Sequence, residues 1–281
     1  MATNVLSQHA IQGSVDGAQS ERLDQYTLWQ ILGIWALAAI PMGILGWVAV
    51  PALSPDFNLD PLGAGATRFG MLTIGLIWQF VLSMILVRKE EGNLRWATIR
   101  RRLRLNAPED PRTGKTRRRL WLLVIPFLMA SIVYELAFVP SVDKLSVSIF
   151  PFLAMPASSN FALIFQSQEI LNSLVGAWWF FGLMLVTNVF NLLGEDFLFR
   201  GVLLPKMEGV FGRWSWLANG VLFGLYHVHM PWTILQNVIS GPLVLAFPSW
   251  RYRSTWMAIG VHGAGSVYFL VIFLGLVLGL A

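Results

Sequence analysis

The chain has 281 residues, of which 56% are apolar and only 12% are charged, and its mean hydropathy is +0.61. Soluble domains carry about 25% charged residues, so this composition excludes an ordinary soluble protein. The net charge of +5 does not indicate nucleic acid binding, because twelve of the twenty Lys and Arg residues fall within residues 88–119. Cytoplasmic loops of membrane proteins are rich in these residues. The absence of cysteine excludes disulfides, thiolate nucleophiles and cysteine-ligated metal sites.

The order of polar and apolar segments predicts a membrane protein. Residues 1–25 are polar, lack the pattern of a signal peptide, and are expected to form a cytoplasmic tail. Residues 26–281 carry apolar runs of about 20 residues, the length that crosses a bilayer as a helix. They predict a single all-α domain, a polytopic transmembrane bundle of about 7–8 helices. The expected spans are 27–49, 68–87, 120–139, 173–205, 214–231, 234–249 and 256–280.

The basic residues predict how the bundle is oriented. Residues 88–119 are expected to form a basic cytoplasmic loop, which places the N-terminus on the cytoplasmic side as well. With seven spans the C-terminus falls outside, and the later basic residues fall on the cytoplasmic side. These residues are Lys206, Arg213, Arg251 and Arg253. We therefore expect an integral membrane protein of a bacterial inner (plasma) membrane, in contact with the lipid bilayer and with no nucleic acid.

Two apolar segments carry features that interrupt a regular helix. Residues 145–165 contain Pro151 and Pro156 and are interpreted as a re-entrant or interfacial segment that does not span the membrane. An eighth span here would move Arg213 outside, against the distribution of the other basic residues. The expected span 234–249 is short, and Gly241-Pro242 predicts a kinked or partly spanning helix here.

A charged cluster lies inside the fourth apolar run, where each charged group costs about 2.5–3.5 kcal/mol on insertion scales. Asp196 and Arg200 are four residues apart, so they share a face of an α-helix and are predicted to form an ion pair. Glu195 is offset from Asp196 by about 100° and lacks such a partner, which makes it the candidate general base. Alternatively, the cluster is the solvated cytoplasmic cap of this helix and has no chemical role.

Two histidine motifs follow in later apolar runs. Phe223 and His227 are four residues apart and share a helix face, and His262 and Ser266 repeat this spacing in the last run. Each motif alone is explained by helix packing and hydrogen bonds between helices. Together with Glu195, two imidazoles on separate helices predict a catalytic centre. A zinc site with Glu195, His227 and His262 as ligands is the alternative, although the H-E-x-x-H motif is absent.

The three motifs resemble those of a known family. Glu-Asp-x-x-x-Arg, Phe-x-x-x-His and His-x-x-x-Ser follow one another within residues 188–268. They are similar to E-E-x-x-x-R, F-x-x-x-H and H-x-x-x-N/D of the CPBP (CAAX protease and bacteriocin-processing, or Abi) family of intramembrane glutamic endopeptidases. The residues at these positions are Glu195, Asp196, Arg200, Phe223, His227, His262 and Ser266. The resemblance implies a catalytic core over 173–281.

The resemblance also implies a role for each matching residue. Glu195 and His227 would activate a water molecule for attack on a peptide carbonyl. His262 and Ser266 would polarise that carbonyl and hold the oxyanion. Arg200 would be structural, paired with Asp196. Hydrolysis would need neither a metal nor another cofactor. The partner would be a peptide or protein substrate at the membrane, prenylated or unprenylated.

One departure from the family motifs keeps other functions open. Ser266 stands where the family has Asn or Asp, and a hydroxyl reaches less far than an amide. Losing one oxyanion donor can cost a factor of about 10²–10³ in rate. A catalytically inactive member that acts as a membrane scaffold or immunity-type factor is therefore the main alternative. A proton-coupled transporter using Glu195 and the histidines is a third, although the chain has no inverted repeat.

Overall fold

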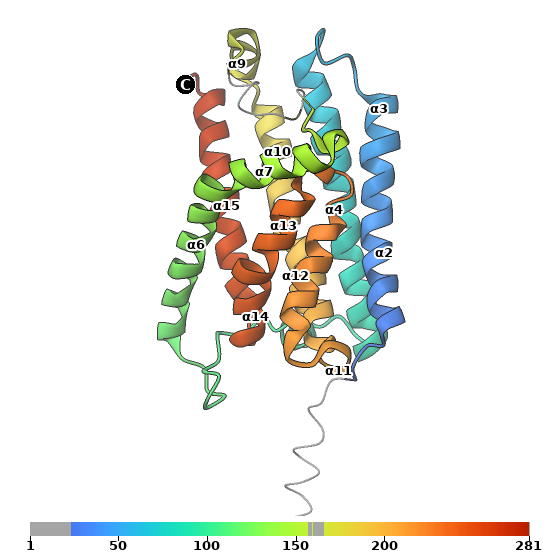
Figure 1. Ribbon diagram of the computed structural model, residues 1–281, viewed down its shortest axis with the longest axis vertical. Coiled ribbons are helices and arrows are strands. Elements are labelled where there is room, and N and C mark those ends of the chain that lie inside the picture. Colours follow the sequence, from blue (N-terminus) through green and yellow to red (C-terminus); the bar gives the residue numbers. More distant parts are fainter. Residues whose placement is uncertain (1–23, 157–158, 160–165, 281) are drawn as a thin grey trace, which may run out of the picture.

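The computed structural model describes residues 24–156, 159 and 166–280. Within these residues the chain forms an all-α bundle whose main helices run along one axis (Figure 1), which confirms the predicted fold class. Five helical stretches are long and apolar enough to cross a membrane. They are Leu28–Leu53, Pro61–Glu91, Arg118–Ile149, Trp178–Lys206 and Trp256–Val277. The predicted polar tail lies almost wholly outside the described residues.

The first two spans extend beyond the predicted apolar runs. They comprise α2 (Leu28–Ile44), a π-helical turn (Leu45–Ala49), α3 (Val50–Leu53) and then α4 (Pro61–Glu91). Thr27 caps the first span in a capping box with Gln30. The second span begins before residue 68 because Asp60 Oδ1 accepts a hydrogen bond from the Gly63 N–H at 2.8 Å. A capping aspartate followed by proline is a strong start signal for a helix.

The basic loop contains a short helix, α5 (Trp96–Arg102), which was not predicted. Its last residue, Arg102, is buried and donates a hydrogen bond to Glu90 Oε2 at 2.5 Å. The same guanidinium donates to the carbonyl oxygens of Gly201 at 3.0 Å and Val202 at 3.3 Å. The loop is therefore anchored to the end of α4 and to the helix that carries the charged cluster.

The third span changes direction within the bundle. It comprises α6 (Val124–Val133), a π-helical turn (Tyr134–Phe138) and α7 (Val139–Ile149). Figure 1 shows α6 at one edge of the bundle and α7 crossing over the other helices. Pro140, in the first turn of α7, removes a backbone donor from the preceding turn and so favours a bend here. The helix thus continues past residue 139, where the apolar run was expected to end.

The segment 145–165, expected not to span the membrane, is described only in part. It includes the end of α7 and a 3₁₀ turn at Pro151–Leu153. Residues 157–158 and 160–165 lie outside the described residues. The non-spanning interpretation of this segment therefore stays a prediction.

The fourth span starts later than predicted and contains an unusual helix. A separate helix, α9 (Gln168–Leu174), ends near Gly176, whose φ of 76° is left-handed and breaks the helix. The span then comprises α10 (Trp178–Phe190) and a π-helix (Asn191–Leu203). The π-helix packs against α4 so closely that a Cβ added at Gly194 would lie 2.5 Å from the Leu76 carbonyl oxygen. The charged cluster therefore lies on a π-helix that packs closely against α4.

The last third of the chain contains shorter helices before the final span. They are α11 (Glu208–Phe211), α12 (Ser215–Tyr226), a 3₁₀ turn (Pro231–Thr233), α13 (Ile234–Ser240), a π-helical turn (Gly241–Ala246) and α14 (Phe247–Arg251). The final span is α15 (Trp256–Val277). Two expected spans, 214–231 and 234–249, are thus not among the five long apolar helices. The first is short because α12 ends at Tyr226. At Gly241-Pro242 the helix widens into a π-turn where a kink was predicted.

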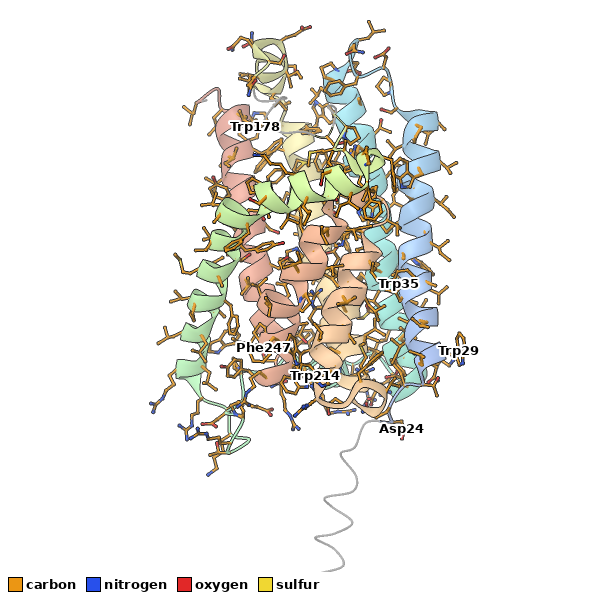
Figure 2. The ribbon with its side chains drawn as sticks, viewed as in Figure 1. Asp24, Trp29, Trp35, Trp178, Trp214 and Phe247 are labelled. Atoms are coloured by element: carbon orange, nitrogen blue, oxygen red, sulfur yellow. The ribbon has the colours of Figure 1, made fainter. Side chains whose placement is uncertain are left out.

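The surface of the bundle is that of an integral membrane protein. Large apolar side chains are exposed along the long helices, including Ile40, Ile74, Leu136 and Val271. Figure 2 shows the exposed indoles of Trp29 and Trp214 near one end of the bundle and that of Trp178 near the other. Indole side chains favour the two membrane–water interfaces. This pattern agrees with an apolar belt between two interfacial rings.

Candidate active site

One internal cavity brings together the three side chains that the sequence singles out. The cavity has a volume of about 370 Å³, and its lining includes Glu195, His227 and His262. Glu195 lies on the π-helix, His227 is the C-cap residue of α12, and His262 lies on α15. A carboxylate and two imidazoles from three separate elements therefore face one space. We call it the polar cavity.

The orientation of His227 is determined by its own helix. Its Nδ1 is 2.9 Å from the carbonyl oxygen of Phe223, which can only accept, so Nδ1 carries the proton. The imidazole also packs edge-on against the Phe223 ring at 4.9 Å and stacks on the His229 ring at 5.7 Å between centroids. In the neutral imidazole, Nε2 is then the basic nitrogen that can accept a proton from water.

Among the described residues Glu195 forms no ion pair, but its carboxylate does have a hydrogen-bond partner. The Tyr226 hydroxyl lies within hydrogen-bonding reach of the Glu195 carboxylate. Gln79 Nε2 on α4 in turn donates to the Tyr226 hydroxyl oxygen at 2.6 Å. This chain of donors orients the carboxylate. Sequence reasoning did not single out Gln79 and Tyr226, although Gln79 is a polar residue within an apolar run and Tyr226 precedes His227.

The predicted Asp196–Arg200 ion pair is looser than expected. Asp196 Oδ1 and Arg200 Nε lie 3.8 Å apart, and the guanidinium donates no hydrogen bond to any described residue. In the π-helix, four residues do not complete one turn, so the two side chains are not stacked as in an α-helix. Asp196 Oδ2 instead accepts a hydrogen bond from His262 Nδ1 at 3.1 Å. Asp196 therefore orients His262 as well as balancing the arginine.

The motif phenylalanine has a physical role beside this arginine. The Arg200 guanidinium lies over the Phe223 ring, with its carbon 3.8 Å from the ring centroid. An aromatic face stabilises a desolvated cation by about 2 kcal/mol. Arg200 and Phe223 thus connect the π-helix to α12, the helix that presents His227.

An asparagine that sequence reasoning missed completes the surroundings of His262. Asn191 Nδ2 lies 2.9 Å from His262 Nε2, and Asn191 also lines the polar cavity. Both ring nitrogens of His262 are therefore engaged, by Asp196 on one side and by Asn191 on the other. The sequence did offer a signal for Asn191, because it is a polar residue in an apolar run, four residues before Glu195.

Ser266 does not share the cavity with His262. It is buried on α15, but the cavity lining includes Gly265 and not Ser266. Residues four apart on an α-helix are offset by about 40°, enough to turn a short side chain away from a narrow cavity. The role of Ser266 therefore stays a prediction. The amide side chain that contacts His262 in this cavity is that of Asn191.

A zinc site would require at least three ligands gathered in one place. Among the residues that the structure describes, no group of three or more His, Asp or Glu side chains is placed to hold a metal ion. Asp196 and Asn191 contact the two ring nitrogens of His262. These contacts occupy the atoms with which an imidazole would bind a metal.

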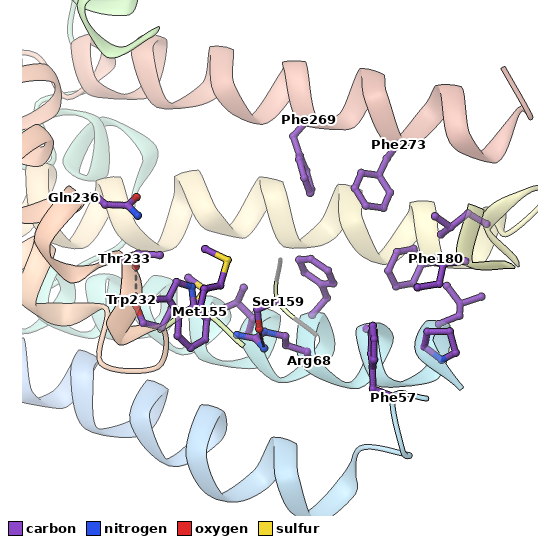
Figure 3. A pocket seen from close by; sticks show the side chains of 18 of the residues that line it. Phe57, Arg68, Met155, Ser159, Phe180, Trp232, Thr233, Gln236, Phe269 and Phe273 are labelled. Atoms are coloured by element: carbon purple, nitrogen blue, oxygen red, sulfur yellow. Dashed lines mark hydrogen bonds between the residues drawn. The ribbon is translucent and has the colours of Figure 1, made fainter. Parts of the chain in front are cut away.

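A second, largely apolar cavity adjoins the polar one. Its volume is about 440 Å³, and Figure 3 shows Phe57, Phe180, Phe269 and Phe273 around it. The two cavities share lining residues, which are Phe69, Leu72, Glu135, Met230 and Phe269. Arg68 lies at the edge of the apolar cavity, over the Trp232 ring at 5.2 Å and hydrogen-bonded to Ser159. Apolar and polar side chains therefore line one continuous region.

The structure thus places a carboxylate and two imidazoles on one cavity of an apolar helical bundle. Residues 177–268 match the family model described as type II CAAX prenyl endopeptidase Rce1-like. No curated protein and no solved structure matches the chain. The family match covers about a third of the chain and contains every motif residue. It confirms the resemblance to the CAAX protease family and supports a membrane endopeptidase of that type.

Proposed function

We propose that the protein is a metal-independent intramembrane endopeptidase in which Glu195 and His227 activate a water molecule. The observation that carries this proposal is the cavity shared by Glu195, His227 and His262. The hydrogen bond from His227 Nδ1 to a backbone carbonyl leaves its Nε2 available as a base. Glu195 and His227 are buried, and burial strengthens the electrostatic contacts of these groups to a transition state.

The proposed reaction adds one water molecule across a peptide bond and so hydrolyses it. Glu195, assisted by His227, takes a proton from water while the water oxygen bonds to the carbonyl carbon. The carbonyl oxygen becomes an oxyanion. As the carbon–nitrogen bond breaks, Glu195 returns the proton to the leaving amine. Asp196 holds His262 through Nδ1, so that Nε2 can donate to the oxyanion when the imidazole is protonated.

Asn191 is proposed as the second oxyanion donor. The family motif places an amide or a carboxyl group at the position of Ser266, and the Ser266 side chain is outside the cavity lining. The Asn191 amide lies 2.9 Å from His262 Nε2 in the same cavity. It can supply the longer donor that serine lacks, so the departure at Ser266 does not by itself remove activity.

Replacing Asn191 with alanine is expected to lower kcat by a factor of about 10²–10³ and to leave KM almost unchanged, because an oxyanion donor acts in the transition state. Steady-state cleavage rates of a membrane peptide provide the measurement. Asn188→Ala is the matched control, since the Asn188 amide also lines the cavity but donates to the Met184 carbonyl at 2.8 Å. It is expected to keep most of the activity.

A second substitution separates a donor role from a structural one. Asn191→Gln keeps an amide on the π-helix and is expected to retain part of kcat, because a donor can still reach the oxyanion. Equal rates for wild type and Asn191→Ala in an active enzyme would contradict the assignment. A loss caused by misfolding would instead lower the folded fraction of the variant.

The substrate is proposed to be a protein or peptide at the membrane whose apolar part, prenyl or other, occupies the apolar cavity. The shared walls of the two cavities support this, because they place an apolar group beside the reacting carbonyl. Comparing kcat/KM for a farnesylated peptide and for the same peptide without the lipid tests this choice. A large preference for the farnesylated form would support a prenylated substrate.

An inactive scaffold or immunity-type factor is the second candidate. The position of Ser266 outside the cavity lining is the observation that favours it. If Asn191 does not serve as a donor, the site lacks one oxyanion contact of the family. A folded protein without peptidase activity, but with a stable membrane partner, would support this alternative.

The N-terminus is proposed to lie in the cytoplasm of a bacterial inner membrane. The basic loop and the start of α2 lie at the same end of the bundle (Figure 1), and basic loops are retained on the cytoplasmic side. The chain has no cysteine, so single cysteines can report its topology. In intact spheroplasts, an impermeant maleimide is expected to label Asn58→Cys and to spare Thr113→Cys until the membrane is opened. The reverse pattern would contradict this orientation.

A further inference from the structure

A groove separate from the two cavities lies at the basic end of the bundle. It has a volume of about 490 Å³ and lies between α5 and the turn that joins α14 to α15. Its lining includes four arginines, Arg100, Arg101, Arg104 and Arg253, and one carboxylate, Glu109. We call it the arginine groove. Its composition favours a negatively charged ligand.

Two of these arginines lack a hydrogen-bonded partner among the described residues, although the Glu208 and Glu109 carboxylates act on the charge of Arg104. Arg101 forms an ion pair with Glu91, and Arg100 Nε donates to the Leu105 carbonyl oxygen at 3.4 Å. Within the described part of the chain, the guanidinium groups of Arg104 and Arg253 form no hydrogen bond and no ion pair. Burial lowers the pKa of Arg104 to about 10, so this guanidinium remains protonated at neutral pH.

Arg104 occupies a backbone position that usually belongs to glycine. At the end of α5, the Leu105 N–H donates to the Arg100 carbonyl at 2.8 Å and the Arg104 N–H donates to the Arg101 carbonyl at 3.2 Å. These two bonds form a Schellman motif, whose left-handed residue is Arg104 with a φ of 50°.

Arg253 occupies the same position at the end of α14. The Ser254 N–H donates to the Ser249 carbonyl at 3.1 Å, and the Arg253 N–H donates to the Trp250 carbonyl at 3.4 Å. Arg253 has a φ of 47°. Two helices that are distant in sequence therefore end in the same motif, and each places an arginine at its left-handed position.

The backbone gives no reason for arginine at these positions. Among the described residues, Arg104 and Arg253 are the only non-glycine residues with a positive φ, whereas α4 ends at Gly92 with a φ of 73°. A helix dipole stabilises a cation near each C-terminus. It does not account for two like charges in a strained conformation on one groove. Strained residues of this kind cluster at binding sites.

Hydrogen bonds hold the two arginines beside each other. The Thr255 N–H donates to the Arg104 carbonyl oxygen at 3.0 Å, and Asn106 Nδ2 donates to the Arg253 carbonyl oxygen at 3.1 Å. The two guanidinium groups therefore extend from a backbone that is already ordered. A site built this way loses little conformational entropy when a ligand binds.

We propose that Arg104 and Arg253 bind a phosphate group in the arginine groove. The planar guanidinium fork matches the oxygens of a phosphate and binds two of them at once. The groove lies at the end of the bundle where the basic loop meets the membrane surface, so the phosphate can come from an anionic phospholipid headgroup or from a soluble phosphate. This site is independent of the peptidase proposal, because it shares no lining residue with the polar cavity.

The test uses the purified full-length protein in a neutral detergent with two probes, inorganic phosphate and dihexanoyl phosphatidylglycerol. Dihexanoyl phosphatidylcholine serves as the lipid without net charge. Arg104→Gly and Arg253→Gly are each expected to raise the Kd of the bound probe by about tenfold or more, because each removes charge-assisted hydrogen bonds. Without the probe, the Tm of each variant is expected to equal or exceed that of wild type, because glycine fits the left-handed backbone.

Arg112→Gly, in the exposed tip of the same loop, removes the same charge outside the groove and is expected to leave Kd unchanged. Binding of phosphatidylglycerol alone identifies a lipid headgroup, and binding of inorganic phosphate identifies a soluble phosphate. Three results would overturn the proposal: no binding of either probe, unchanged Kd in both glycine variants of the groove, or an equal loss in Arg112→Gly.

Discussion

Replacing Glu195 with glutamine is expected to lower kcat/KM for peptide cleavage by a factor of about 10²–10⁴, the contribution of a positioned general base. Glutamine has the same shape and can still accept the hydrogen bond of Tyr226, but it cannot take a proton from water. The fold should remain intact, because removing a buried charge also removes its desolvation cost. Cleavage rates and thermal unfolding of the same preparation measure both effects.

Glu135→Gln is the matched control for this result. Glu135 also lines the polar cavity, on the π-helical turn between α6 and α7, and is assigned no part in the reaction. It should keep its cleavage rate within a small factor of wild type. Equal losses in the two variants would mean that any carboxylate on the cavity contributes to the rate, and Glu195 would then not be the specific general base. An active Glu195→Gln enzyme would contradict the general-base assignment directly.

Replacing Arg102 with alanine is expected to cause the largest loss of stability in the chain. The guanidinium is buried and donates to Glu90 and to the carbonyl oxygens of Gly201 and Val202. Breaking a buried ion pair costs about 3–5 kcal/mol. The lower end of this range applies, because Lys206 stays 3.1 Å from the Glu90 carboxylate. The free energy of unfolding in detergent, together with the yield of folded protein, measures the loss.

The neighbouring arginine provides the control for Arg102. Arg101 forms an ion pair with Glu91, but its side chain is 63% exposed. Exposed ion pairs contribute about 0–1 kcal/mol, so Arg101→Ala should unfold almost as wild type does. Both substitutions remove one positive charge from the same loop. Similar losses in the two variants would mean that loop charge, and not the buried contacts of Arg102, stabilises the bundle.

The helical fold could be predicted because hydrocarbon requires every backbone polar group to be satisfied within the chain. Long apolar runs therefore identified α2, α4 and α15. The predicted starts of two helices were wrong although the sequence carried signals for them, Asp60-Pro61 at the start of α4 and Gly176 before α10. The π-helix at Asn191–Leu203 had none, because it depends on how closely this segment packs against α4.

The candidate site was predictable to the extent that polar residues in apolar runs are rare. Glu195, His227 and His262 were identified in this way and lie on one cavity. Asn191 and Tyr226 were not, because their proximity depends on the arrangement of helices in space. The four-residue spacing from His262 could not show whether the Ser266 side chain lines the polar cavity, because a helix face is wider than the cavity that it borders. Its assigned role therefore stays a prediction, as do the catalytic roles of the other residues.

The most direct measurement of the central claim is cleavage of a farnesylated membrane peptide by the purified wild-type protein in H₂¹⁸O with an excess of chelator. Mass spectrometry of the products reports both the position of the cut and the origin of the new oxygen. We predict a single cleaved peptide bond, one ¹⁸O atom in the new carboxylate and a rate that the chelator does not change. A folded protein that leaves this peptide and its unfarnesylated form uncut, or that loses its activity to the chelator, would contradict a metal-independent endopeptidase.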